Sequence, residues 1–582
     1  MNRRSFFSIL AAGVAVLLLT GIGGYYWLMR ESPLNLLLGG NQTTPTAAIF
    51  VPKQAPVMVS MLVNPDRLEA LGQAVTRPGE RRRSLRSISQ LKTTLLANSG
   101  LDYRQDIKPW LGEEITLAVT TLDIDRDDRN GRQPGYLMAL ATQDAERSRE
   151  FLQLLFSKRS VAGTNLEFEQ YKGVKLVYDN SRPQLDKQNA FDPSPATRVG
   201  MLSGAVVGDR FVLLANHPKV LRDAINNVQA PDLNLSSSNQ YQQALTLLPP
   251  RQIGVAFLNL PRVVGWQGLE PEPQTYESQI IALELNRQGL LAETTLLAAP
   301  SQEIAPPAPV LSQLVGALQY IPDATGFSIS GSDLSRLENT DLNQLWTQVS
   351  AALSGSGYDA ISRLIKQPLA EFQARWGIDL DQDIFSWVQG EYALGLLPHA
   401  DQTPPDWIFV AEKSDAATAG ISRLDAIASS QGLSITVLPL EDQKISAWTE
   451  LTTAPTKSDE PDRALIALKA KVHGVHATVG NYEIFTTSIE AMDEALKAPK
   501  IGSLVDNPKF QTSIDAIPQP NQGYVYLDWT TSQGILERQL PILQLLEVAG
   551  KPFFSKLRSL TISSYGSVSG AIEGGVFFRF NN

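Results

Sequence analysis

Short runs of apolar residues alternate with turn-forming residues along most of the chain. Eight runs in the first half have the length and residue types of β-strands: Val57–Val63, Ile115–Leu122, Tyr136–Thr142, Val199–Val207, Arg210–Ala215, Ile253–Leu260, Ile280–Leu285 and Leu290–Leu297. Three other segments place apolar residues at helical spacing: Ala145–Ser157, His217–Asn227 and Tyr241–Leu248. Hairpin-length loops separate several neighbouring strands. The pattern predicts an α+β fold with largely antiparallel sheets.

One apolar run is long enough to cross a membrane. Phe6–Met29 contains 24 residues without a charge, and as a helix it would span about 36 Å. Arg3 and Arg4 precede it, so the positive-inside rule keeps the N-terminus in the cytoplasm and exports the rest. A cleaved signal peptide and twin-arginine export are the alternatives. We expect an N-terminal signal anchor and transmembrane helix at residues 1–30, followed by a tether at 31–46.

The exported part contains an internal duplication. Residues 100–119 and 377–396 are identical at eight of 20 positions, where ordinary residue usage gives about one. Other matches follow in the same order at offsets near 270–277. We therefore predict two homologous α+β repeats at residues 47–300 and 311–582, joined by a Pro-rich linker at 301–310.

The anchored N-terminus, the tandem copies and the repeated Gly-x-Asp-x-x-x-Asp-Ile-x-x-Trp signature together resemble one protein family. It is an uncharacterised, mainly cyanobacterial family of membrane-anchored proteins with a tandem domain of unknown function. The resemblance implies a cyanobacterial source, with the bulk of the chain in the periplasm or the thylakoid lumen. It implies no reaction, cofactor or catalytic residue.

The repeated signature supplies the main candidate site. Its members are Asp102, Asp106, Trp110 and Glu114 in the first copy, and Asp379, Asp383, Trp387 and Glu391 in the second. Such carboxylates could act as general acids and bases or bind a cation. A structural role fits the spacing better, because Asp106 would cap a short helix, Gly112 would end it in a left-handed turn, and Trp110 would pack it on the sheet.

Two charged clusters are weaker candidates. Arg77, Arg81, Arg82, Arg83 and Arg86 form a basic patch that could contact anionic lipid or an acidic partner, or could simply be solvated. The loop Asp123–Asn130 is rich in Asp, as calcium loops are. It lacks the turn glycine and the final glutamate of such a loop, so a solvated hairpin loop is the simpler interpretation.

Histidine and cysteine usage excludes most metal and nucleophile chemistry. The chain has no cysteine and four histidines, so disulfides, Cys-ligated metals and Cys nucleophiles are excluded. His473 and His476 lie three apart in a predicted strand, Lys469–Val479, and so face opposite sides of it. No common catalytic or nucleotide-binding motif is present. We expect no cofactor and no metal.

The composition excludes some classes of function but does not identify a single one. The net charge of −10 argues against nucleic acid as a partner. We expect a non-catalytic, membrane-anchored binding or assembly protein whose partner is another protein. The alternative is a carrier or chaperone for a hydrophobic ligand, and a less supported one is an envelope hydrolase. A dry apolar cavity would favour the carrier, an exposed apolar patch the binding protein, and a pocket with paired carboxylates the enzyme.

Overall fold

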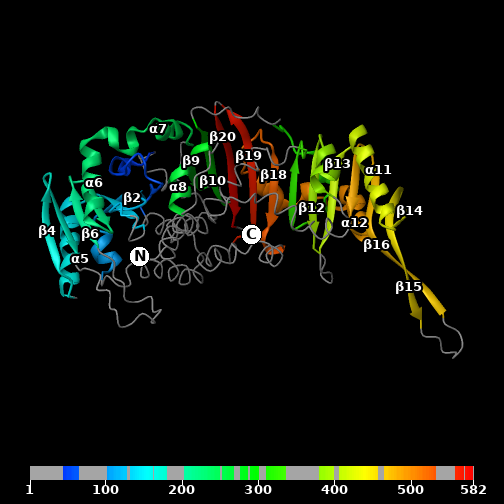
Figure 1. Cartoon of the computed structure of the whole chain (residues 1–582), viewed down its shortest axis with the longest axis horizontal. Helices are drawn as coiled ribbons and strands as arrows, with labels where there is room; N and C mark the ends of the chain where they lie inside the picture. The colour runs from blue at the N-terminus through cyan, green and yellow to red at the C-terminus, as the bar shows by residue number, and fades with distance from the viewer. Residues whose placement is uncertain are drawn as a thin grey trace. The chain divides into compact units, whose positions relative to one another are not determined.

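The computed structural model divides the chain into two compact units, each described here by itself (Figure 1). The described residues of the first unit lie within 44–299, and those of the second within 310–580. The complete set of described residues is 44–64, 101–127, 132–161, 163–179, 202–249, 252–267, 276–285, 289–299, 310–335, 379–398, 405–456, 465–531, 557–568 and 570–580.

The described part of the first unit contains ten strands, all paired in antiparallel ladders. They are β1 (Val57–Met61), β2 (Leu111–Thr121), β3 (Gly135–Thr142), β4 (Leu166–Tyr171), β5 (Val174–Asp179), β6 (Ser203–Val207), β7 (Phe211–Ala215), β8 (Gly254–Asn259), β9 (Tyr276–Leu285) and β10 (Gly289–Ala298). Their order across the sheet is β10-β9-β8-β1-β2-β3-β7-β6-β5-β4.

Helices lie against both faces of this sheet. The α-helices are α5 (Ala145–Val161), α6 (Pro218–Gln229), α7 (Asn239–Thr246) and α8 (Leu260–Gln267), and the short helical turns are η1 (Thr46–Phe50), η2 (Tyr103–Ile107), η3 (Pro231–Leu233) and η4 (Leu235–Ser237). Along β3, Leu137 and Ala139 join the core cluster that includes α6, whereas Met138 and Leu140 join the cluster that includes α5. Central strands therefore have no solvent face, which explains their continuous apolar runs.

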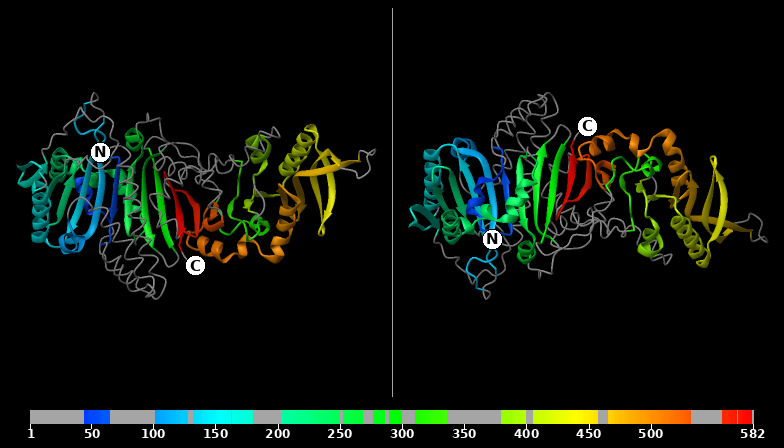
Figure 2. Two further views of the ribbon diagram at one scale, coloured as in Figure 1. Left: turned by 90° about the horizontal axis from the view of Figure 1, so that it is seen from below. Right: turned by 90° about the horizontal axis from the view of Figure 1, so that it is seen from above.

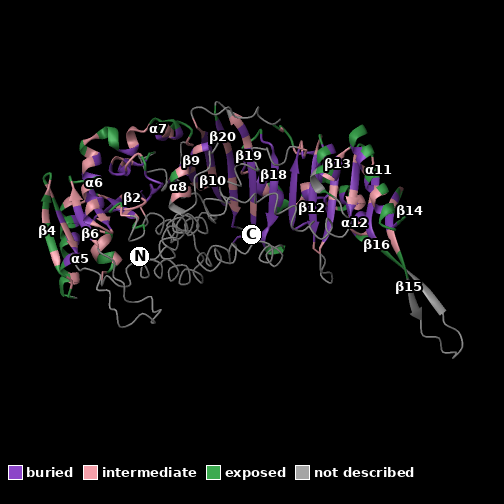
Figure 3. Ribbon diagram, viewed as in Figure 1, coloured by how far each residue is buried: buried purple, intermediate pink, exposed green. Residues whose placement is uncertain are grey.

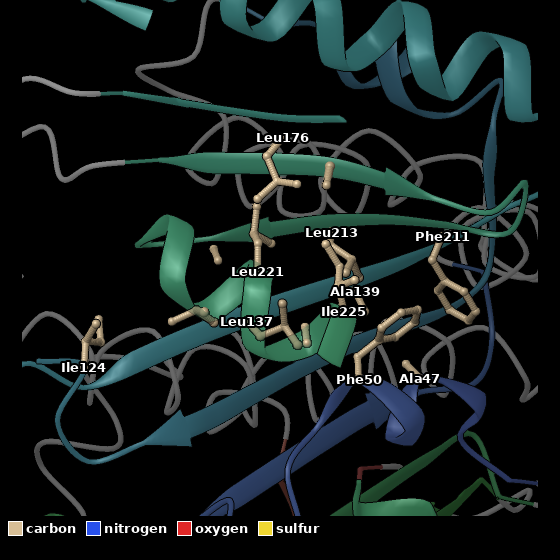
Figure 4. Close-up of a cluster of buried hydrophobic side chains, with 14 residues drawn as sticks. Ala47, Phe50, Ile124, Leu137, Ala139, Leu176, Phe211, Leu213, Leu221 and Ile225 are labelled. Atoms are coloured by element: carbon tan, nitrogen blue, oxygen red, sulfur yellow. The ribbon is translucent and has the colours of Figure 1, made fainter. Parts of the chain in front are cut away.

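Helix α6 shows how local sequence builds this packing. The Nδ1 atom of His217 accepts a hydrogen bond from the backbone N–H of Lys219 (3.1 Å), and Pro218 suits the first helical turn. Leu221 and Ile225, one helical turn apart, point at the sheet beside Leu213 (Figure 4). Buried aliphatic side chains of this size each stabilise the fold by about 1.5–3 kcal/mol.

The second unit repeats the arrangement of the first. Its strands are β11 (Phe327–Gly331), β12 (Tyr392–Leu397), β13 (Asp406–Glu412), β14 (Ser434–Leu440), β15 (Gln443–Thr456), β16 (Leu465–Val479), β17 (Tyr482–Thr486), β18 (Gly523–Asp528), β19 (Ser559–Val568) and β20 (Ala571–Arg579). Their order is β20-β19-β18-β11-β12-β13-β17-β16-β15-β14, again antiparallel throughout. Each strand has the place of the strand ten numbers lower in the first unit.

The helices of the second unit also flank the sheet. They are α11 (Asp415–Ser430), α12 (Ile489–Ile501) and α13 (Pro508–Ile514), with the turns η5 (Gly316–Tyr320), η7 (Leu380–Ile384), η8 (Phe385–Trp387) and η9 (Leu504–Asp506). Figure 2 shows α11 (yellow) and α12 (orange) on opposite sides of the strands. Burial follows this layering, because buried residues lie along the central strands and exposed ones along β4 and β14 (Figure 3).

The predicted fold class is wrong. An α+β fold headed by a transmembrane helix was expected, but the described residues are dominated by antiparallel sheet, with ten strands in each unit and few helices. Among these residues, none of the helices is both long and apolar enough to cross a bilayer. The apolar run Phe6–Met29, the tether at 31–46 up to residue 43, and the linker residues 301–309 lie outside the described residues.

Strand content was underestimated because polar hairpins were not recognised. Residues 166–179 form the hairpin β4–β5, whose turn residues Lys172 and Gly173 both have positive φ, 48° and 85°. Apolar and polar residues alternate from Leu166 to Glu169 before that turn, which is a strand pattern. In the second unit, β15 continues to Thr456 through a stretch rich in threonine. Exposed hairpins keep strand alternation while having too few apolar residues to stand out.

Candidate functional site

The signature Asp residues build the same short turn in both units. In the first unit, Asp102 Oδ1 accepts hydrogen bonds from the N–H groups of Arg104 (2.9 Å) and Gln105 (3.0 Å). Asp106 Oδ2 accepts from the N–H of Asp102 (2.8 Å), which closes the turn from the other side. In the second unit, Asp383 Oδ2 accepts from the N–H of Asp379 at the same distance, 2.8 Å. Both carboxylates of each pair are therefore engaged with backbone amides.

Two details of the predicted turn are wrong. The capping residue is Asp102 rather than Asp106, because Asp102 directly precedes η2 and faces its free amides. Gly112 does not end a helix in a left-handed turn but lies in β2. A Cβ atom there would approach the carbonyl oxygen of Ala141 to 3.0 Å, so the glycine allows close strand packing.

The signature tryptophans hold each turn against the sheet. Trp110 Nε1 donates to the carbonyl oxygen of Asp106 (2.7 Å), and Trp387 Nε1 donates to that of Asp383 (2.6 Å). The two side chains are 1% and 9% exposed, which places both in the core. A buried indole with its N–H satisfied is a packing element, and this geometry agrees with a structural role for the signature.

The signature glutamates anchor the first helical turn of each unit. Glu114 is fully buried and accepts hydrogen bonds from the N–H groups of Thr46 (3.0 Å) and Ala47 (2.8 Å) at the start of η1. Glu391 accepts from the N–H of Gly316 (2.7 Å) at the start of η5. Amides at a helix start lack partners within the helix, so a carboxylate there satisfies them.

The other candidates do not form a site in the described residues. Arg77, Arg81, Arg82, Arg83 and Arg86 lie outside the described residues, as do residues 128–131 of the Asp-rich loop. His473 and His476 both lie in β16, where His473 meets Glu450 (2.8 Å) and His476 meets Asp425 of α11 (3.1 Å). No group of three or more potential metal ligands occurs in the described part of the chain.

An apolar cavity lies inside the second unit, between its sheet and the elements η7, η8 and α11. Its lining is aromatic and aliphatic in equal parts, and the aromatic residues are Phe385, Trp387, Tyr392, Trp407, Phe409, Trp448 and Phe485. Its volume is about 60 Å³, several times the roughly 10–15 Å³ that one water molecule needs. With so few polar partners, the cavity favours an apolar occupant over water.

The helix that packs on the signature tryptophan presents different residues to it in the two units. In the first unit, Trp110 packs against Phe151 of α5, with ring centroids 4.8 Å apart. In the second unit, Trp387 packs directly on Gly420 of α11, where an added Cβ would lie 2.5 Å from the indole ring. The first unit fills this layer further with Leu152 and Phe156. Ile421 and Leu424 of α11 line the cavity beside Trp387 in the second unit.

Polar groups at the cavity are few. Glu483 of β17 is a lining residue that is 5% exposed, and its Oε2 accepts a hydrogen bond from Thr478 Oγ1 (2.8 Å). Tyr392 also lines the cavity, and burial, with a further contribution from Asp333, raises the pKa of its phenol above the ordinary value. The tyrosine is therefore neutral at physiological pH, and Glu483 is the single carboxylate among the described lining residues.

Sequence reasoning missed this cavity and Glu483. Glu483 lies in β17, a strand that pairs on both edges within a sheet that has helices on both faces. A charged residue there has no solvent face to point to. The cavity itself had no sequence signal, because it depends on how α11 packs against Trp387.

Known proteins give limited guidance. A family model described as "Protein of unknown function (DUF3352)" matches residues 10–580. No curated protein matches the chain. Among solved structures, crystal form I of TP0453 is similar with 8% identity and a TM-score of 0.23, covering 45% of this chain and 81% of that one. Crystal form III of TP0453 gives 9% identity and a TM-score of 0.24, covering 45% and 83%. Similarity at this level supports no inference about this chain.

Proposed function

The chain belongs to the DUF3352 family, and because that family's description names no activity, we propose from the structure that the second unit binds a small apolar ligand in the cavity beneath α11. The observation that carries the proposal is the aromatic, nearly non-polar lining of the cavity. Such a lining binds apolar groups by removing them from water. The protein is then a carrier or binding protein. Export of the bulk of the chain and a cyanobacterial source both stay predictions.

The size of the cavity limits the ligand. At about 60 Å³ it is smaller than an engineered cavity of about 150 Å³ that admits benzene. It suits a short hydrocarbon chain or the end of a longer one. A hydrolase that works with paired carboxylates would need a second one in reach of the substrate, and the described lining residues include only Glu483.

Binding is tested with 1-bromobutane, whose bromine quenches indole fluorescence on contact. Three of the nine tryptophans, Trp387, Trp407 and Trp448, line the cavity. We expect quenching that saturates as the 1-bromobutane concentration rises and that removes at most the emission of these three tryptophans. Ile421→Phe, which adds a ring from α11 into the cavity, should weaken 1-bromobutane binding about tenfold, equal to about 1.4 kcal/mol.

The matched control is Ala426→Phe, which adds the same ring on the exposed face of α11. It should bind 1-bromobutane as the wild type does. Linear quenching without saturation in the wild type, or equal binding by Ile421→Phe and the wild type, would contradict the proposal.

A protein-binding role is the second candidate, and exposed apolar residues on the outer strands favour it. In the described residues, β4 pairs only with β5 and β14 pairs only with β15. Phe168 on β4 is 77% exposed, and Val437 on β14 is 62% exposed. Open strand edges accept an extended peptide as an added strand. A photo-crosslinking residue placed at position 168 or 437 in the native membrane should capture the partner. If the same residue at an exposed position of α11 captures that partner equally well, the strand edges are not its binding site.

A further inference from the structure

Glu483 occupies a place that is apolar in the first unit. In the first unit, Val206 of β6 pairs with Val212 of β7, one pair away from the turn that joins the two strands. In the second unit, Thr478 of β16 pairs with Glu483 of β17 at the same place relative to its turn. The first of these turns is one residue longer, so Glu483 corresponds in register to Val212. Val212 is fully buried in the cluster that contains Trp110.

The residue that pairs with this position on the neighbouring strand also differs between the two units. Leu140 of β3 pairs with Val212, whereas Ala411 of β13 pairs with Glu483. The fold therefore needs neither the charge nor the hydroxyl at this place, since the first unit fills it with aliphatic side chains. The second unit has lost volume here and gained a carboxylate.

Burying the Glu483 carboxylate lowers the stability of the fold unless a partner group compensates its charge. Glu483 is 5% exposed, and in the described part of the chain it forms no ion pair. Its side-chain hydrogen bond from Thr478 engages Oε2 alone. Burying a charge without a partner is unfavourable, and such groups gather at functional sites because a ligand can supply the missing charge.

We propose that Glu483 selects a cationic ligand, so that the cavity binds a small primary amine by its alkyl chain and pairs the ammonium group with this carboxylate. The inference rests on the proposed function, because it names the ligand class of the same cavity. An ammonium group donates up to three hydrogen bonds, and bonds between charged partners are the strongest of their kind. The aromatic rings around the cavity add favourable contacts for a cation.

The test compares four-carbon molecules that differ only in the polar group. 1-Butylamine, 1-butanol and butyrate compete with 1-bromobutane for the wild-type chain at pH 7, at one salt concentration. We expect 1-butylamine to bind about tenfold more tightly than 1-butanol, and butyrate to bind most weakly. This comparison needs no variant, so it stands even if a substitution impairs folding.

Glu483→Gln keeps the shape and the acceptor for Thr478 but removes the charge. We expect it to bind 1-butylamine and 1-butanol equally, so that the roughly tenfold preference of the wild type for the amine is lost. Glu490→Gln removes one charge at an exposed position of α12 and should keep the wild-type preference for the amine.

The two proposals fail in different ways. If 1-bromobutane binds but 1-butylamine is no tighter than 1-butanol, the amine inference is wrong and the cavity still binds apolar ligands. If Glu483→Gln keeps the full preference for the amine, the carboxylate is not its source and the inference is also wrong. If no four-carbon molecule binds the wild type saturably, the proposed function itself is wrong.

Discussion

Trp110 and Trp387 have the same hydrogen bond but different neighbours on the helix that covers them. Each indole N–H donates to the carbonyl of an Asp four residues earlier. Trp110 then meets Phe151, whereas Trp387 meets the bare backbone of Gly420. The hydrogen bond within the signature depends only on the local spacing of Asp and Trp, which the sequence displays directly. The neighbour across the layer is not local and could not be predicted.

Replacing Trp110 tests the structural role of the signature. Trp110→Ala should lower the free energy of unfolding of the first unit by about 3–5 kcal/mol, because it removes a fully buried ring and leaves a cavity. Urea unfolding followed by hydrogen exchange in β2 and β3 measures this locally. Phe168→Ala, at a side chain that is 77% exposed, should change stability by less than about 0.5 kcal/mol. Equal effects from the two variants would contradict a core role for Trp110.

Replacing Glu114 tests whether a carboxylate is needed at the start of η1. Glu114→Gln should destabilise the first unit by about 1–3 kcal/mol, because an amide cannot accept all the bonds that Thr46, Ala47 and Thr116 donate to Glu114. Glu150→Gln, at an exposed position of α5, is the matched control. Hydrogen exchange of residues 46–50 reports the loss directly, and unchanged protection there would show that the cap is dispensable.

At the scale of elements, hairpins decided how well the fold could be predicted. Long apolar strands such as β2 and β3 were recognised because both of their faces are buried. The hairpin β4–β5 has mostly exposed or half-exposed side chains, so its alternation was not read as a strand pair. The position of Glu483 was also obscured, since the turns before β7 and β17 differ by one residue and an ungapped comparison of the copies sets Glu483 against Phe211.

The contact between α13 and the end of β18 should give the second unit a pH-dependent contribution to stability. Burial raises the pKa of Asp528, but hydrogen bonds from Thr530, Lys509 and the Thr531 amide outweigh it, so the net pKa lies below the usual 3.8. A lowered folded-state pKa stabilises the fold above the unfolded pKa, and this stability is lost as pH falls through the folded pKa.

Asp528→Asn should therefore cost about 1–3 kcal/mol at pH 6, through loss of the charged bond to Lys509. The difference from the wild type should shrink as pH falls from 4 towards 2, since Asp528 becomes protonated in the wild type. Urea midpoints measured at pH 6, 4 and 3 follow this trend. A difference that stays constant across these pH values would mean that the charge of Asp528 contributes nothing.

At the scale of the whole molecule, one topology is used twice, and the two copies have diverged in their cores. Both units have ten described strands in the same order. Asp106, Trp110 and Leu117 have the same structural contexts as Asp383, Trp387 and Leu394, since Leu117 pairs with Val59 of β1 and Leu394 with Ile329 of β11. Collinear sequence matches of the kind found here arise because both copies must satisfy the same backbone. Side-chain volume can change in one copy alone, and that is where a binding function can arise.

Because each copy has a complete set of strands, a core substitution in one unit should leave the stability of the other unchanged. Limited proteolysis of the full chain tests this. The sequence predicts a Pro-rich linker at 301–310, so we expect the first cut between the two units to fall there. Trp110→Ala should speed digestion of fragments from residues 44–299 and leave those from 310–580 at the wild-type rate. Trp387→Ala should do the reverse, which makes each variant the control for the other. If either substitution accelerates digestion of both halves equally, the units unfold together and the chain behaves as one cooperative domain.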